Sequence, residues 1–142
     1  INLNDNKWEK KLEKEEEISK KPRKRVTIGS SNKSLIIFIK KILFEGKADN
    51  IVEIAVDKNF SEFDHIVIAS GSSNRQVVFL AEKLIEEVKC SFKIKGKMEG
   101  KENADWILLD FLSVIVHIFR PEVREYYQIE KIWKDHLKNL SN

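Results

Sequence analysis

Apolar residues are most concentrated between residues 106 and 119, in the run WILLDFLSVIVHIF. This run contains no Gly or Pro, and its pattern predicts two short strands joined by a tight turn at Leu112 and Ser113. Side chains alternate between the two faces of a strand, so pairing Phe111 with Val114 sorts the run into two faces. The first face is wholly apolar and is predicted to join the core: Ile107, Leu109, Phe111, Val114, Val116 and Ile118.

The second face of this predicted hairpin combines apolar side chains with an acid and an imidazole. Its members are Trp106, Leu108, Asp110, Ile115, His117 and Phe119. The same pairing places Trp106 opposite Phe119 and Leu108 opposite His117. We expect this face either to be covered by a helix or to be kept for a partner.

The rest of the pattern predicts three helices and three further strands. The helices are expected at 35–45 with Ser34 as cap, at 73–89 with Ser73 and Gln76 at capping-box spacing, and from Pro121 onward. The strands are expected at 51–56, 64–70 and 92–95, with a loop at 96–105 and the second helix crossing between the last two of these strands. The predicted fold class is α/β (α+β), a small mixed five-stranded sheet flanked by helices.

Charge divides the chain into an extension at 1–32 and one domain at 33–142, with a linker at 29–32. The extension holds nine Lys/Arg and six Asp/Glu, which accounts for the whole net charge of +3, so the domain is neutral. A neutral domain argues against a large nucleic-acid surface. A basic cluster in the extension is either a solvated charge run or a contact for phosphate, with RNA as the favoured partner: Lys20, Lys21, Arg23, Lys24 and Arg25.

Candidate chemistry is sparse. The Gly71-Ser72-Ser73 turn between a strand and a helix could cradle an anion, as in nucleotidyltransferases, but the paired magnesium-binding carboxylates of that chemistry are missing. A turn and helix cap is the preferred interpretation. The scattered histidines and the lone Cys90 predict no zinc site, metal or cofactor, and Cys90 suits a reducing compartment. Asp110 and His117 could form an acid/base pair, but structural contact or recognition is favoured over catalysis.

Three separated motifs resemble the Iojap family, also called ribosomal silencing factor S: FSEFDHIVIASGSSNRQV, WILLDFLSVIVHIF and REYYQIEKIWKD. The resemblance covers residues 35–135. One departure is Leu112-Ser113, where the family usually has Gly followed by Asp or Asn. Two-residue hairpin turns usually need positive φ, which Leu adopts poorly, so the turn is expected to be wider or bulged.

The resemblance implies a nucleotidyltransferase-like fold without the active site, and a binding function rather than an enzyme. It implies binding to the uL-fourteen family protein of the large ribosomal subunit, which prevents subunit joining and acts in translational silencing or in large-subunit assembly. The ribosomal partner is typically basic. On this basis we expect a partner-binding patch on the second hairpin face, extended by the last helix: Trp106, Leu108, Asp110, His117, Phe119, Tyr127 and Glu130.

Two alternative functions remain: an RNA-binding module using the basic extension, and a nucleotidyltransferase-type enzyme. A start at Ile1 instead of Met is expected to reflect missing upstream residues or a removed leader. With the basic extension it favours a mitochondrial matrix or plastid location, and a bacterial cytoplasm is the alternative. In mitochondria the resemblance allows a LYR-motif protein with acyl carrier protein as a further partner. Apolar runs are too short for a membrane span.

Overall fold

The computed structural model describes residues 31–56 and 62–140, with side chains for 32–56 and 62–134. The helices are α2 (Ser31–Glu45), α3 (Asn74–Phe92), α4 (Pro121–Tyr127) and α5 (Ile129–Leu140). The strands are β1 (Asp49–Ala55), β2 (His65–Ser70), β3 (Lys97–Glu99), β4 (Trp106–Asp110) and β5 (Val114–Phe119). The described strands form one sheet in the order β1-β2-β5-β4-β3. Only β2 and β5 pair in parallel, so the predicted mixed five-stranded sheet is confirmed.

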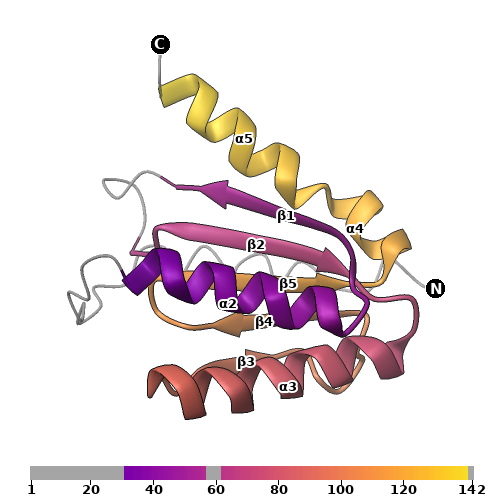
Figure 1. Cartoon of the computed structure of the whole chain (residues 1–142). Helices are drawn as coiled ribbons and strands as arrows, with labels where there is room; N and C mark the ends of the chain where they lie inside the picture. The colour runs from indigo at the N-terminus through magenta and orange to yellow at the C-terminus, as the bar shows by residue number, and fades with distance from the viewer. Residues whose placement is uncertain (1–30, 57–61, 141–142) are drawn as a thin grey trace.

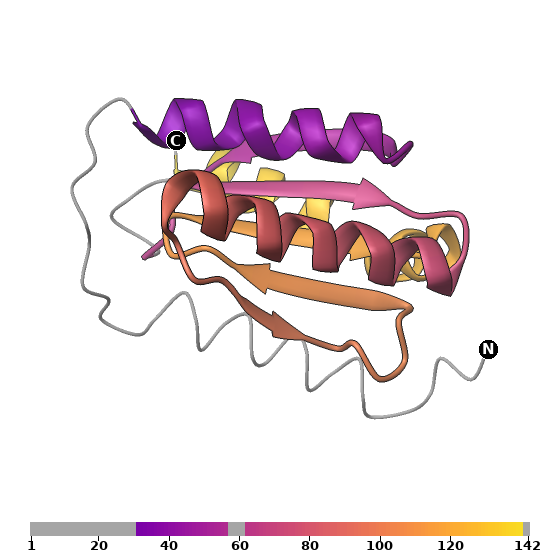
Figure 2. The same cartoon turned by 60° about the horizontal axis from the view of Figure 1, so that its bottom comes forward.

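Helices cover both faces of the sheet (Figure 1). Figure 2 shows α2 and α3 side by side on one face, with α4 and α5, orange to yellow, behind the strands. One core cluster joins α2 and α3 to the predicted core face of the hairpin, whose six side chains are all fully buried. A second cluster joins α4 and α5 to the opposite face of the sheet. The domain therefore has three layers, and the hairpin lies in the middle one with helices on both sides.

The hairpin of β4 and β5 has the predicted register. Trp106 pairs with Phe119 and Leu108 pairs with His117. The turn is closed by hydrogen bonds from Phe111 N to Val114 O at 2.9 Å and from Ser113 N to Phe111 O at 3.0 Å. The second of these bonds spans only two residues and leaves Leu112 between them at φ 72°. This is a γ-turn with positive φ, which is strained for a residue that has a Cβ. The expected wider or bulged turn is therefore wrong: the turn stays tight, and Leu112 adopts the positive φ.

Three elements meet at this turn. The Ser113 carbonyl accepts from Asp64 N at 2.8 Å, and the Ser113 hydroxyl donates to Asn32 Oδ1 at 2.7 Å. The Asn32 amide in turn donates to Asp64 Oδ2 at 2.7 Å. The first turn of α2 is thereby tied to the start of β2, and α2 begins at Ser31 instead of after the predicted cap at Ser34. The predicted linker at 29–32 overlaps this turn; residues 29 and 30 lie outside the described part.

The predicted third strand at 92–95 is wrong. Phe92 ends α3, and Lys93 follows it in the left-handed conformation at φ 58°. The Phe92 ring packs 5.1 Å from the Phe38 ring, and this contact favours helix over the alternating pattern. The edge strand lies instead at 97–99, inside the predicted loop. As predicted, α3 crosses between the second and third strands.

The single helix predicted after Pro121 is also wrong, because the chain bends at Gln128. Gln128 has φ 47°, and its N–H closes α4 by donating to the Arg124 carbonyl at 2.9 Å. Helix α5 starts directly afterwards with the buried Ile129. The bend lets Val123 of α4 and Ile129 of α5 both pack into the same core cluster.

We predict that Leu112→Gly is more stable than Leu112→Ala by about 1 kcal/mol, because only glycine removes the positive-φ strain. Both variants lose the Leu112 atoms beyond Cβ, and they differ only in Cβ itself. The difference between their free energies of unfolding therefore reports the backbone conformation at position 112. Urea denaturation followed by circular dichroism measures the two free energies of unfolding. An alanine variant as stable as the glycine variant would show that the turn is unstrained.

Candidate functional site

The second hairpin face is an aromatic layer inside the protein. Trp106, His117 and Phe119 are completely buried. The Trp106 and Phe119 rings stack with centroids 4.7 Å apart, and Trp106 Nε1–H donates to His117 Nδ1 at 2.9 Å. A buried indole N–H needs an acceptor, and here the imidazole supplies it. We call Trp106, His117 and Phe119 the Trp106 layer.

Helices α4 and α5 cover the Trp106 layer. Val123 and Ile129 are buried against it, and the Tyr127 ring lies 5.4 Å from the Trp106 ring. Further along, Trp133 packs edge-on against the buried Phe63 at 5.5 Å. Of the two expectations for this face, cover by a helix is the one that holds.

Asp110 and His117 take separate structural roles. Asp110 Oδ1 accepts a hydrogen bond from Leu112 N at 2.9 Å and so holds the strained turn. His117 accepts from Trp106 on the neighbouring strand. Each group has a contact that accounts for its burial, which agrees with the structural interpretation and not with an acid/base pair.

The structure buries the hairpin members of the predicted docking patch, and their role in binding stays a prediction. Trp106, Leu108, His117 and Phe119 have at most 1% of their surface exposed, and Asp110 has 8%. The sequence showed both faces of the hairpin to be apolar, but not which one a helix would cover. Tyr127 and Glu130 are the members of the predicted set that stay partly accessible. Their role in binding remains a prediction.

The accessible surface over the Trp106 layer is the α4–α5 corner, by which we mean residues 121–134. Tyr126 and Ile132 are each 54% exposed there. Arg124 fixes the corner: it donates from Nε to Glu130 Oε1 at 2.5 Å and from Nη1 to the Ser70 hydroxyl at 2.7 Å. Glu130 is partly exposed, and its bond to Arg124 also fixes the start of α5. A shallow hollow of about 450 Å³ is lined by Asn50, Ser70, Pro121, Arg124, Glu125, Gln128, Glu130 and Lys131.

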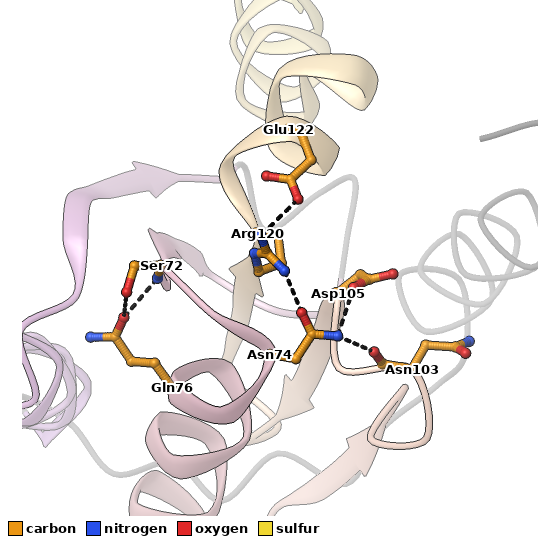
Figure 3. Close-up of polar contacts among 7 residues, drawn as sticks. All are labelled: Ser72, Asn74, Gln76, Asn103, Asp105, Arg120 and Glu122. Carbon is orange, nitrogen blue, oxygen red and sulfur yellow. Dashed lines mark hydrogen bonds and ion pairs between the residues drawn. The ribbon is translucent and has the colours of Figure 1, made fainter. Parts of the chain in front are cut away.

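The Gly-Ser turn caps its own helix (Figure 3). Gln76 Oε1 accepts from Ser72 N at 2.6 Å, and Gln76 N donates to the Ser73 hydroxyl at 3.0 Å. Gly71 N donates to the Phe119 carbonyl at 2.8 Å. The amides of Gly71, Ser72 and Gln76 are thus occupied within the chain, so the helix-cap interpretation is supported.

A polar network links this turn to α4, and the sequence did not predict it. The Asn74 amide donates to the Asn103 carbonyl at 2.9 Å and to Asp105 Oδ1 at 3.1 Å, and Figure 3 shows these residues together. Arg120 donates to the Asn74 side-chain oxygen and pairs with Glu122 at 3.1 Å. No local sequence pattern signals it, because its bonds join residues that are 29 and 46 positions apart. This network positions the start of α4 and therefore the cover over the Trp106 layer.

Other predicted features are tested only where the structure describes the chain. Within residues 31–56 and 62–140, no group of three or more His, Cys, Asp and Glu could hold a metal ion. Of the described helices, none is long and apolar enough to cross a membrane. The basic cluster predicted to contact RNA lies outside the described residues: Lys20, Lys21, Arg23, Lys24 and Arg25.

The family model described as ribosomal silencing factor during starvation matches residues 29–141. Similar proteins include the ribosomal silencing factor of Haemophilus influenzae, which is 41% identical over 101 residues covering 70% of this chain and 98% of that protein. The corresponding factor of Zymomonas mobilis is 40% identical over 99 residues, covering 70% of this chain and 74% of that protein. The chain belongs to the ribosomal silencing factor family, whose members are named for a regulatory role and not for an enzymatic one.

A solved structure and relatives named as mitochondrial or chloroplastic agree with this assignment. A crystal structure from Chromobacterium violaceum superposes with a TM-score of 0.68 at 33% identity, covering 72% of this chain and 85% of that one. A mouse protein named for mitochondrial assembly of the ribosomal large subunit is 36% identical over 95 residues, covering 65% of this chain and 42% of that protein. The predicted family and fold are confirmed. Relatives occur in bacteria, mitochondria and chloroplasts.

We predict that Trp106→Ala lowers the free energy of unfolding by about 3–5 kcal/mol, because it opens a cavity beneath α4. Trp106→Phe keeps most of the ring and removes the N–H donor, so it should cost less than the alanine change. Tyr126→Ala, on the exposed side of the same helix layer, should change stability by less than about 0.5 kcal/mol. Urea unfolding measures all three variants. A Trp106→Ala protein as stable as wild type would restore Trp106 as an accessible binding residue.

Proposed function

We propose that this chain binds the large ribosomal subunit through its uL-fourteen family protein and prevents the subunits from joining. It would act in translational silencing or in assembly of the large subunit. Membership of the silencing-factor family over residues 29–141 is the observation that carries the proposal. Its relatives are named for ribosomal silencing and for assembly of the large subunit.

The α4–α5 corner is the surface that we assign to this partner. Protein interfaces are built on exposed aromatic and aliphatic side chains with a polar rim, and Tyr126 and Ile132 supply such side chains here. Glu125 and Glu130 line the neighbouring hollow and would complement a basic ribosomal protein. Tyr127, packed on the Trp106 layer, would anchor the patch to the core. The buried hairpin then supports the binding surface from beneath.

The alternative functions have less support. An enzyme of nucleotidyltransferase type would need an open anion site at the Gly-Ser turn, where the Ser72 amide already donates to Gln76 Oε1. An RNA-binding module acting through the basic extension stays a proposal, as does recruitment of a LYR-motif protein with acyl carrier protein. A mitochondrial matrix, plastid or bacterial cytoplasmic location is compatible with the relatives' names.

Co-sedimentation with purified large subunits tests the proposal. We expect the wild-type chain to pellet with them and the Tyr126→Ala/Ile132→Ala variant to bind about 10-fold or more weakly, since truncated hot-spot side chains typically cost at least 1–2 kcal/mol. Phe79→Ala is the matched control, because Phe79 is a similarly exposed aromatic (51%) on α3, across the sheet. It should bind like wild type.

A photo-crosslinking amino acid at position 126 identifies the partner. We expect it to label the uL-fourteen family protein, whereas the same group at position 79 should not. In a gradient assay, excess chain should shift joined ribosomes toward free subunits. The proposal is wrong if the folded wild-type chain ignores large subunits, or if the label falls on another protein.

A further inference from the structure

The outward face of α2 exposes apolar side chains to an unusual degree. Ile37 is 60% exposed and Phe44 is 76% exposed. Together with Lys33 and Lys41 they follow helical spacings of three and four residues, so the four lie along one face. The opposite side of α2 holds its buried residues, so folding of the described domain does not use this face.

Positive charge is gathered on the same segment. Residues 31–48 contain four Lys and one Glu, whereas residues 49–142 contain thirteen Lys/Arg and sixteen Asp/Glu. The domain as a whole has no net charge, but the segment that contains α2 is basic. Lys40 is turned to the side, where it pairs with Glu53 of β1 at 3.2 Å. Lys41 has only a long contact of 3.9 Å with Glu45, and both side chains are largely exposed.

The neighbouring helix provides a comparison. On α3, Phe79 is 51% exposed, with Arg75 and Lys83 one turn away on either side. There, Glu82 and Glu86 accompany the basic residues, and Glu82 pairs with Lys101 at 2.6 Å. The outward surface of α3 is thus balanced in charge, and that of α2 is not.

We propose that the outward face of α2 contacts single-stranded ribosomal RNA, with Lys33 and Lys41 binding phosphates and Phe44 stacking on an unpaired base. Lysines interleaved with an exposed aromatic ring fit nucleic acid, because phosphates take the ammonium groups and every base offers a face for stacking. A protein partner would more commonly meet an aromatic patch depleted of lysine.

This inference extends the proposed function by adding a second contact to the large subunit, away from the α4–α5 corner.

The test uses the full chain and a fluorescent single-stranded RNA of about 12 nucleotides, within the usual range of site sizes. We expect Lys33→Ala/Lys41→Ala to weaken binding about 10-fold near 0.1 M salt and to reduce the slope of log affinity against log salt by about 1.4. Phe44→Ala should weaken binding about five-fold or more. Arg75→Ala/Lys83→Ala and Phe79→Ala are the matched controls on α3 and should stay within about two-fold of wild type.

Three results would overturn this inference. They are a folded wild-type chain that does not bind the RNA, α2 variants with wild-type affinity and salt slope, and α2 variants that keep RNA affinity but lose co-sedimentation with large subunits. The last result would assign the face to a protein. Crosslinking from position 126 is independent of these RNA measurements, so the inference and the proposed function can fail separately.

Discussion

The central constraint in this fold is that the β4–β5 hairpin is apolar on both faces, so each face needs its own helical cover. On one side α2 and α3 supply it. On the other side the cover must also accommodate Trp106, whose indole N–H cannot be left without an acceptor when buried. His117 provides that acceptor at 2.9 Å from the paired strand. Helices α4 and α5 can then cover the Trp106 layer without leaving the indole N–H unpaired.

This cover determines which surface is accessible on its side of the sheet. Because the Trp106 layer is buried, that accessible surface is the outer side of the α4–α5 corner, and its geometry depends on how the two helices are held. Arg124 holds them by bridging Glu130 and Ser70, and Arg120 holds the start of α4 through Asn74. The proposed binding function needs this kind of rigid, exposed patch on a packed support.

Much of the fold could be predicted from the sequence, because strand alternation and capping residues are local signals. The hairpin register and the Ser73 cap are examples. The failures were non-local. Phe92 extends α3 because it meets Phe38. The last helix bends at Gln128, and Arg124 there bonds both to Glu130 and to Ser70, which is 54 residues away in the chain. For the site, the sequence identified the hairpin as important but could not reveal which helix would cover its second face.

Hydroxyl-radical footprinting of the free chain and of the chain bound to large ribosomal subunits tests the central claim most directly. It reports side-chain accessibility residue by residue. We predict that Tyr126 and Ile132 react in the free chain and are protected in the complex, whereas Trp106 and Phe119 are unreactive in both. Reaction of Trp106 in the free chain followed by its protection on binding, with Tyr126 and Ile132 unchanged, would contradict the account and return the docking surface to the hairpin.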